Sequence, residues 1–457
     1  MELPHAPARP EHRLGRIRLW APVVVQPLRS AEDCPTDERE ALLTRLFDVR
    51  ATTETLAAPL LPEDQVVQSM PDVSPTKWHR AHTTWFFETF VLGPHAPGYR
   101  PVEPAYDYLF NSYYEQVGPR FPRPDRGLLS RPTVSEVADY RSLVDERLGA
   151  FLADADTATW LAVAPLIDLG VHHEQQHQEL LLMDIKHVFS RNPLHPAYRP
   201  APVAADPGQP PPLRWVDIDV DDVVEVGHDG VGFAFDSEGP RHRVLVEPFR
   251  LADRLVTCGD WLAFIEDGGY LRPELWLSEG WATVMLEGWQ APLYWRAEVD
   301  RWSVFTLGGL RPVVPSEPVV HVSFVEADAY ARWAGARLAT EEEWEVAATL
   351  VGAGDRPNDL GTGALHPRAA GAAPHPGLRQ LAGDVWEWTA SPYRPYPGFR
   401  PPPGAVGEYN GKFMCNQMVL RGGACITPVG HTRPTYRNFF PPGARWAFSG
   451  LRLASDA

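Results

Sequence analysis

Residues 172–189, with the sequence HHEQQHQELLLMDIKHVF, predict a long helix and decide how the first half of the chain folds. His173 and His177 are four residues apart, so on a helix they lie on one face with about 5–6 Å between their Cβ atoms. Leu180 and Asp184 continue this face, which indicates that the two histidines point into a helical bundle. The spacing allows two imidazoles to reach one metal ion, although surface or core histidines can show the same pattern by chance.

A third ligand is expected on a second helix, where a core-facing stripe at helical spacing contains one histidine. The stripe consists of Trp78, His82, Trp85, Phe86 and Thr89. A lone histidine on an apolar stripe is more often a core residue than a ligand, but a neighbouring helix with two facing histidines favours a metal site. We therefore expect His82 to be the third ligand. His79 is the competing candidate, and it could instead contact one of the ligands without binding the metal itself.

The ligand type narrows the choice of metal and chemistry. Three neutral imidazoles suit iron, zinc or copper. A zinc hydrolase would usually add a general base close to the metal. Glu174 is adjacent to His173 in the sequence but lies about 100° around the helix, so it is poorly placed for that role. An open site with three free positions favours iron, which can hold two substrates and O2 together.

Four helical segments make a four-helix bundle the simplest fold for residues 36–192. The segments span residues 37–49, 76–92, 133–152 and 168–189. The third segment opens on Thr133 with Glu136 three residues later, which is the pattern of a capping box. Residues 1–35 are rich in proline and arginine and lack a clear period, so we expect a tail or a surface arm.

A proline-rich stretch separates this bundle from a second domain of different composition. Residues 193–212 contain eight prolines, and because proline removes a backbone donor and fixes φ, we expect an extended linker. Residues 213–457 hold twelve of the sixteen tryptophans. Strands are expected at 243–246, 319–322 and 418–420, and helices at 324–333 and, after a capping box at Thr340, to about 350. The whole chain is predicted to be a two-domain α+β protein.

The composition of the 457-residue chain excludes several classes of function. Its net charge of −17 argues against nucleic acid as the main partner, since phosphate binding needs a basic surface. The chain contains no run of about 18 apolar residues, so no membrane helix is expected. Its four cysteines are too few and too scattered for a disulfide framework, and we expect a cytoplasmic protein with free thiols. Cys415 and Cys425 could form a thiol pair for copper or redox chemistry, but buried inert cysteines are the favoured interpretation.

Further candidates for chemistry lie near aromatic residues. Tyr113 and Tyr114 are adjacent in the stretch FNSYYE, and a phenol near the metal could donate a proton to bound oxygen. The residues alone favour the alternative, a pair of packed aromatic side chains. In residues 433–440 (RPTYRNFF) and 449–453 (SGLRL), arginine and asparagine beside aromatic rings could bind a carboxylate and a cation.

Together these stretches resemble a known family, the iron-dependent sulfoxide synthases of ergothioneine biosynthesis. The resemblance covers residues 37–457 and implies a DinB-like four-helix bundle followed by a C-type-lectin-like domain similar to formylglycine-generating enzymes. The matching stretches are 74–87 (SPTKWHRAHTTWFF), 109–118 (LFNSYYEQVG), 173–186 (HEQQHQELLLMDIK), 335–344 (GARLATEEEW), 383–389 (GDVWEWT), 409–418 (YNGKFMCNQM) and 433–453.

The resemblance implies a ligand set and a proton donor. Iron(II) would be bound by His82, His173 and His177, and not by His79. Tyr113 and Tyr114 would match the tyrosine pair of the branch that uses free cysteine. One of the two phenols would give a proton to the bound oxygen.

The resemblance also implies the substrates and the reaction. Hercynine, which is trimethylhistidine, would be held by Gln176 and Asn438, with Phe439 and Phe440 near its ammonium. In an O2-dependent reaction, the imidazole carbon between the two nitrogens would gain a bond to a thiol sulfur, which is oxidised to a sulfoxide. The metal would gather both substrates and oxygen, so that the encounter becomes intramolecular. The site is expected between the two domains.

Several positions depart from the family pattern as we interpret it. Ala382 stands where a phenylalanine is usual, Ala424 where a serine is frequent, and Ala447 where a glutamine is frequent. These positions lie in loops that could line the substrate pocket, so smaller side chains could enlarge the site of the sulfur or selenium donor. Related enzymes join hercynine to a selenosugar to make selenoneine. The donor is therefore either cysteine, which we favour, or a selenosugar.

Three other classes of function remain as alternatives. The second domain resembles formylglycine-generating oxidases, which use copper and a cysteine pair. A non-catalytic lectin-like binding module is another possibility, and metal content would separate it from an enzyme. An ovothiol-type synthase would join cysteine to histidine itself, at a different ring carbon.

Overall fold

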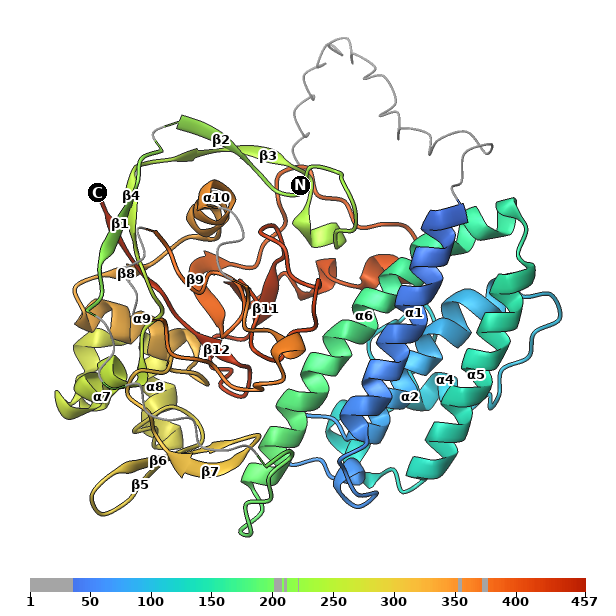
Figure 1. Ribbon diagram of the computed structural model, residues 1–457, viewed down its shortest axis with the longest axis horizontal. Coiled ribbons are helices and arrows are strands. Elements are labelled where there is room, and N and C mark those ends of the chain that lie inside the picture. The colour runs from blue at the N-terminus through green and yellow to red at the C-terminus, as the bar shows by residue number, and fades with distance from the viewer. Residues whose placement is uncertain (1–35, 201–207, 209–211, 221, 352–355, 372–376) are drawn as a thin grey trace, which may run out of the picture.

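The computed structural model describes residues 36–200, 208, 212–220, 222–351, 356–371 and 377–457. A helical bundle lies beside a domain of short strands, helices and long loops, and helix α6 forms the side of the bundle that faces this second domain (Figure 1). Most of the buried apolar residues of the bundle and of the second domain form one continuous cluster, and a smaller second cluster around Phe249 and Leu251 lies within the second domain. The predicted two-domain α+β architecture is confirmed. The expected tail, residues 1–35, lies outside the described residues.

The bundle consists of the four helices that the sequence predicts. They are α1 (Thr36–Ala57), α2 (Thr76–Phe87), α5 (Val134–Asp154) and α6 (Thr157–Ser190). Helix α5 begins with the expected capping box of Thr133 and Glu136. Shorter helical segments connect these elements: η1 (Asp64–Val66), η2 (Glu88–Leu92), α3 (Gly93–His95), α4 (Tyr106–Phe110) and η3 (Arg123–Leu128).

Three of the helical boundaries differ from the prediction, and the first of them is the end of α1, which lies at Ala57 and not near Val49. Helix α6 begins at Thr157 and not near Asp168, because the Asp156 side chain accepts a hydrogen bond from the backbone of Thr159 and caps an earlier first turn. Pro165 lies inside this helix. The predicted helix over residues 76–92 changes after Phe87 into the π-helical segment η2.

The second domain is built on two four-stranded sheets. One has the order β1-β4-β13-β8 and antiparallel pairs; the other has the order β11-β10-β9-β12, in which only β12 runs parallel to its neighbour. Two small antiparallel sheets, β2-β3 and β5-β6-β7, complete the described strands.

The strands are β1 (Trp215–Ile218), β2 (Asp222–Val226), β3 (His242–Val246), β4 (Phe249–Ala252), β5 (Trp295–Ala297), β6 (Trp302–Thr306), β7 (Gly309–Pro312), β8 (Arg337–Leu338), β9 (Trp386–Pro392), β10 (Met418–Arg421), β11 (Asn438–Phe440), β12 (Ser449–Gly450) and β13 (Leu453–Asp456). The helices are α7 (Cys258–Glu266), α8 (Ser278–Glu287), α9 (Phe324–Trp333) and α10 (Glu341–Val351). Single helical turns lie at η4 (Asp236–Glu238), η5 (Gly269–Leu271), η6 (Pro273–Leu275), η7 (Leu360–Thr362), η8 (Ala405–Glu408) and η9 (Gly411–Phe413).

One predicted strand of the second domain is wrong. Residues 319–322 are buried, but they form no regular strand, because His321 has a positive φ of 67° that interrupts the extended backbone. The segment instead pairs at separate points, through Val319 N to Val256 O and Val322 N to Ser449 O. The strands predicted near 243–246 and 418–420 and the helices at 324–333 and 341–350 are confirmed.

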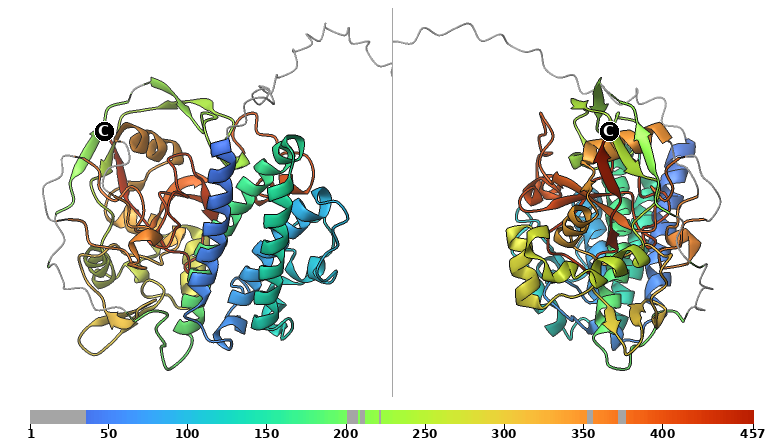
Figure 2. Two further views of the ribbon diagram at one scale, coloured as in Figure 1. Left: turned by 45° about the vertical axis from the view of Figure 1, so that its right-hand side comes forward. Right: turned by 90° about the vertical axis from the view of Figure 1, so that its left-hand side faces the viewer.

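The beginning of the expected linker is attached to both domains. Tyr198 is buried, its hydroxyl donates to the Leu56 carbonyl at the end of α1, and its backbone N–H donates to Leu307 after β6. The rest of the linker, residues 201–207 and 209–211, lies outside the described residues, and its boundaries stay a prediction. The second domain covers one side of the bundle when the molecule is viewed from that side (Figure 2).

No helix in the part of the chain that the structure describes has the length and apolar character needed to cross a bilayer.

A buried lysine joins the two domains. Lys186 of α6 places its Nζ 2.6 Å from His321 Nε2, and 4.6 Å and 5.0 Å from the ring centres of Phe448 and Tyr294. Burial lowers the pKa of Lys186 from its ordinary value near 10.5 to about 7. At neutral pH, therefore, a large share of this lysine is uncharged.

This lysine predicts a pH dependence of stability. The folded protein releases the Lys186 proton near pH 7, whereas the unfolded chain keeps it up to about pH 10. The unfolded state then binds more protons, so stability rises with pH. Between pH 7.0 and 8.5, we expect the thermal midpoint of the wild type to rise by roughly 1–2 °C relative to that of Lys186→Met. Scanning calorimetry at both pH values measures this, and parallel curves for the two proteins would contradict it.

Candidate metal centre and substrate cavity

Helices α2 and α6 bring three histidines together. One nitrogen from each of His82, His173 and His177 lies within 4.8 Å of the other two. No other group of three or more histidine, cysteine or carboxylate side chains in the described residues meets this condition. The ring of Trp78 stacks on His82 at 4.6 Å, and Phe86 lies against His173 at 4.8 Å between ring centres. The structure thus brings together the three histidines that the sequence predicted as metal ligands.

Hydrogen bonds orient the rings for metal binding. His82 Nδ1 lies 2.6 Å from the Phe110 carbonyl, so Nδ1–H donates and Nε2 keeps its lone pair. That Nε2 lies 3.1 Å from His173 Nε2, while His173 Nδ1 is buried without a hydrogen-bond partner. Nitrogen lone pairs that converge in this way are stabilised by a cation between them, so the site fits a metal ion.

Burial keeps the three imidazoles neutral. It lowers the pKa of His173 to about 3, and it lowers the pKa of His82 and of His177 well below their ordinary value. The neighbouring histidines lower the pKa of His82 and His177 further. All three rings are therefore in the neutral form that binds metals at physiological pH.

His79, the competing candidate, lies behind the cluster. Its Nδ1 is 2.9 Å from His177 Nδ1, and its Nε2 is 3.0 Å from Asp184 Oδ2. The same carboxylate oxygen accepts the backbone N–H of Ser74. The hydrogen bonds from Asp184 through His79 hold the ring of His177 in one orientation, as carboxylate–histidine pairs do for metal ligands in metalloproteins.

A cavity of about 440 Å³ opens beside the histidines, between the two domains. It is lined by His173 and His177 from the bundle and by residues of the second domain. Of the other residues that the sequence proposed, those that line the cavity are Tyr113, Gln176, Asn438, Phe439 and Phe440. His82 and Tyr114 do not line it and are completely buried.

The two alanines proposed for the donor pocket are not among the lining residues. Ala447 is completely buried, directly after Trp446, which does line the cavity. Ala382 is half-buried and precedes Gly383, whose positive φ of 79° belongs to a turn against Asn358. An effect of Ala447 on the cavity would therefore have to pass through Trp446.

The structure adds a tyrosine to the two that were predicted. Tyr409 lines the cavity, its ring lies 5.7 Å from His173 and 6.1 Å from Tyr113, and its hydroxyl donates to Gln176 Oε1. Tyr113 and Tyr114 have their hydroxyls 3.4 Å apart. Burial raises the pKa of all three phenols, so each carries its proton at neutral pH. Residues 409–418 were noted as a matching stretch, but nothing in the sequence placed Tyr409 beside His173.

Two buried charged groups in the cavity wall were also missed. Glu179 accepts from Trp386 Nε1 and Thr427 Oγ1, both at 2.6 Å, and has no ion pair with an arginine or lysine among the described residues. Burial raises its pKa to about 7. Arg126 donates to the hydroxyls of Ser74 and Ser112, and likewise has no ion pair in the described part of the chain.

Arg126 is placed by stacking as well as by these hydrogen bonds. Its guanidinium carbon lies 3.4 Å from the ring centre of Trp78. Burial lowers its pKa well below the ordinary value, Arg123 and Arg120 lower it further, and the carboxylate of Asp184 offsets only part of this shift. Sequence patterns could not show that these two groups lack an ion pair, because the residues that surround each of them in the fold lie far away along the chain.

Of the two cysteines expected to be buried and inert, Cys425 is buried and Cys415 is not. Cys425 is completely buried, and burial raises the pKa of its thiol well above the ordinary value, which disfavours the thiolate. Cys415 is exposed, and both thiols are free. The structure gives no support to a copper-binding pair.

Two family models match the two halves of the chain. The DinB superfamily matches residues 45–187, and the sulfatase-modifying factor enzyme 1-like domain matches residues 220–374 and 358–457. The formylglycine-generating enzyme of Streptomyces coelicolor is 30% identical over 50% of this chain and 84% of its own length. The fold and site thus define a two-domain protein in which a DinB bundle carries a histidine site and a sulfatase-modifying-factor-like domain closes it.

Relatives with both domains identify the family. The hercynine oxygenase of Mycolicibacterium thermoresistibile is 35% identical, and the match covers 84% of this chain and 88% of the relative. The hercynine oxygenase of Mycobacterium tuberculosis is 34% identical, with coverage of 84% and 92%. The chain belongs to the hercynine oxygenase family, and the resemblance inferred from the sequence is confirmed at this level.

The ligand set gives a direct prediction. We expect His177→Ala to lose stoichiometric iron binding, because two imidazoles remain where three converge. His79→Ala should keep the ligands and weaken binding roughly 10–100-fold, since it only orients His177. The control is His187→Ala on the same helix, whose ring contacts Ser69 away from the cluster. Anaerobic Fe(II) titration measures all three, and full iron occupancy in His177→Ala would remove this residue from the ligand set.

Proposed function

We propose that the protein is an iron(II)- and O2-dependent enzyme that joins a thiol sulfur to the imidazole of hercynine and forms a sulfoxide. The best-supported donor is cysteine, which makes the enzyme a hercynylcysteine sulfoxide synthase of ergothioneine biosynthesis. The observation that carries the proposal is the neutral three-histidine site at the wall of an interdomain cavity, in a chain whose two-domain relatives are named hercynine oxygenases.

His82, His173 and His177 would hold the iron, and Asp184 would orient His177 through His79. Iron(II) held by these three nitrogens would supply the redox chemistry that joins the thiol sulfur and O2 to the substrate. The protein's part is to gather the reactants, to exclude water and to control protons.

The imidazole substrate is best accommodated beside Gln176. The amide oxygen of Gln176 accepts from Tyr409, and its amide nitrogen donates to the Tyr436 hydroxyl at 2.8 Å, so the side chain has a fixed orientation. Asn438 Oδ1 accepts the Phe439 N–H at 2.8 Å, which leaves the amide nitrogen to donate to a carboxylate.

A quaternary ammonium suits the other part of this wall. Phe440, Trp386 and Trp446 provide aromatic faces, which attract a cation that cannot form hydrogen bonds. Glu179, held by Trp386 and Thr427, adds a buried carboxyl group with a pKa of about 7, whose ionised form a bound cation would stabilise. Hercynine carries both a permanent cation and a carboxylate, and the cavity offers a partner of opposite charge or polarity for each.

Arg126 suits the carboxylate of the sulfur donor. Its guanidinium is fixed by Trp78 and two serine hydroxyls and lacks an anionic partner, so a carboxylate would be bound by charge-assisted hydrogen bonds. Ser112, which contacts Arg126, directly precedes Tyr113, so a sulfur donor bound to Arg126 would lie beside a phenol.

The phenols control protons at the reaction centre. Tyr113 and Tyr409 both line the cavity with protonated hydroxyls, so either can give a proton to a developing anion. Tyr114 lies behind Tyr113 and can return the proton through the contact between their hydroxyls.

A competition assay tests the function and the donor together. The Fe(II)-loaded protein receives hercynine with equal amounts of cysteine, γ-glutamylcysteine and a selenosugar under anaerobic conditions, and O2 is then admitted. We expect hercynylcysteine sulfoxide to dominate by mass spectrometry. A preferred selenium adduct would assign the protein to selenoneine synthesis. Consumption of histidine in a parallel reaction would indicate an ovothiol-type enzyme, and no adduct despite bound iron would contradict the proposal.

Two single variants separate the proposed substrate sites. We expect Glu179→Gln to raise the KM for hercynine about tenfold, because a charged partner of the ammonium is lost, and to leave the KM for the thiol nearly unchanged. Arg126→Met should show the opposite pattern. Steady-state kinetics with each substrate varied in turn measures this, and the same KM rising in both variants would contradict the assignment.

A further inference from the structure

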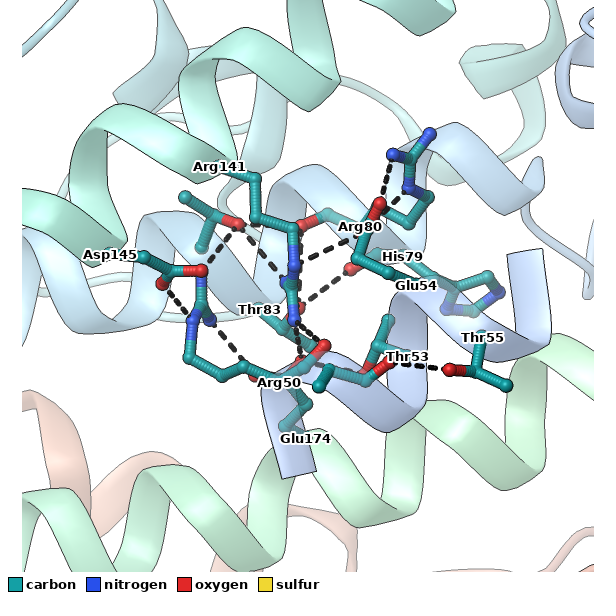
Figure 3. Close-up of polar contacts among 12 residues, drawn as sticks. Arg50, Thr53, Glu54, Thr55, His79, Arg80, Thr83, Arg141, Asp145 and Glu174 are labelled. Atoms are coloured by element: carbon teal, nitrogen blue, oxygen red, sulfur yellow. Dashed lines mark hydrogen bonds and ion pairs between the residues drawn. The ribbon is translucent and has the colours of Figure 1, made fainter. Parts of the chain in front are cut away.

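A buried charge cluster crosses the bundle behind the histidines (Figure 3). It contains three arginines and three carboxylates: Arg50, Arg80, Arg141, Glu54, Asp145 and Glu174. These residues come from all four long helices, and Glu174 directly follows His173. The proposed reaction uses none of them.

Glu174 points away from the cavity into this charge cluster. It is completely buried, and it accepts hydrogen bonds from Thr53 at 2.6 Å, from Arg50 Nη1 at 3.0 Å and from Arg141 Nη2. A carboxylate with three donors is held in both position and rotation. The backbone of α6 next to His173 is therefore fixed against α1 and α5.

Arg141 also contacts α2, the helix that carries His82, through the other terminal nitrogen of its guanidinium. Its Nη1 lies 3.2 Å from Thr83 Oγ1 and 3.3 Å from Thr84 Oγ1, and Thr83 directly follows His82. Its Nη2 donates to Glu174 and to the Arg50 carbonyl. One planar group thus joins the residue after His82 to the residue after His173.

We propose that Arg141 is a positioning residue for the metal centre, which sets the rotation of α2 relative to α6 so that His82 and His173 converge. The proposal rests on the metal site of the proposed function.

Apolar packing alone fixes the distance between these helices but not their rotation. A Cβ at Gly170 of α6 would lie 2.5 Å from the Phe87 ring, so glycine allows the close approach of α6 to the end of α2. Packing of this kind tolerates small rotations and slides, whereas a rigid guanidinium with hydrogen bonds in two directions does not. Contacts between neutral imidazoles are weak and do not by themselves fix three rings at one point, so directional contacts from the helices are needed to hold the site ready for the metal.

Stability by itself does not account for this charge cluster. Four of the six groups, Arg50, Arg80, Arg141 and Glu174, are buried, which costs hydration, and well-packed apolar side chains are often as stabilising as a buried ion pair. The charge cluster lies next to His82 and His173, two of the predicted ligands. Its directional contacts can specify one arrangement of the helices that carry them, which apolar packing would not do.

The test compares metal binding in three variants with the full-length protein. Arg141→Lys keeps the charge but cannot reach both helices with one rigid fork. Thr83→Val with Thr84→Val removes both threonine contacts of Arg141, together with the hydrogen bond from Arg50 to Thr84, and keeps the Arg141–Glu174 pair. Tyr140→Phe is the matched control, because it removes a buried 2.6 Å hydrogen bond to Glu88 from the neighbouring position of α5.

Cobalt(II) reports both affinity and geometry at the site. Each protein is first shown to be folded by circular dichroism, and is then titrated with Co(II) while its d–d absorption is recorded. We expect the Arg141 and Thr83/Thr84 variants to bind at least tenfold more weakly and with altered band positions. Tyr140→Phe should keep the wild-type affinity and spectrum even where its melting temperature falls.

Other outcomes would overturn the inference in distinguishable ways. Wild-type affinity and spectrum in a folded Thr83/Thr84 variant would show that the fork does not position the ligands. Equal changes in Tyr140→Phe would show that the site follows overall stability. Absence of Co(II) and Fe(II) binding in the wild type would instead remove the metal centre itself, and with it the proposed function.

Discussion

The constraint on which the structure depends is the convergence of three neutral imidazoles in a buried site. Burial keeps His82, His173 and His177 neutral, and the weak contacts between neutral rings do not fix all three at one point. Their positions have to come from the helices that carry them. Close packing at Gly170 limits the distance between α6 and the end of α2. The hydrogen bond to the Phe110 carbonyl orients the ring of His82, and the contact with His79 orients the ring of His177.

Helix α6 presents three different faces to its surroundings, because successive residues of a helix are rotated by about 100°. One face carries His173 and His177 toward α2. A second face carries Glu174 into the charge cluster of the bundle. The third face, with Gln176 and Glu179, contacts the second domain through Tyr409, Tyr436, Trp386 and Thr427. Metal site, support and substrate wall thus belong to one rigid element, so a shift of α6 would disturb all three.

Much of the architecture could be predicted from local patterns. The four helices, the capping boxes at Thr133 and Thr340 and the strands at 243–246 and 418–420 follow from periodicity and short-range hydrogen bonds. The prediction was wrong at 319–322, where β-branched residues suggested a strand but His321 adopts a positive φ. Nearby sequence could not reveal this, because the segment is held by Val256 and Ser449, which are distant along the chain.

The candidate site divides in the same way. The sequence by itself determined the HxxxH pair, the histidine on the facing stripe and the family, because helical spacing and ordered matching stretches are properties of the linear chain. Only the tertiary structure decided that Tyr409 lies beside His173, that Glu179 and Arg126 are unpaired charges in the cavity wall, and that Ala382 and Ala447 do not line it. The reason is physical: whether a charge is paired or a phenol faces a cavity depends on contacts between the two domains, which are made by residues more than two hundred positions apart, such as Glu179 and Trp386.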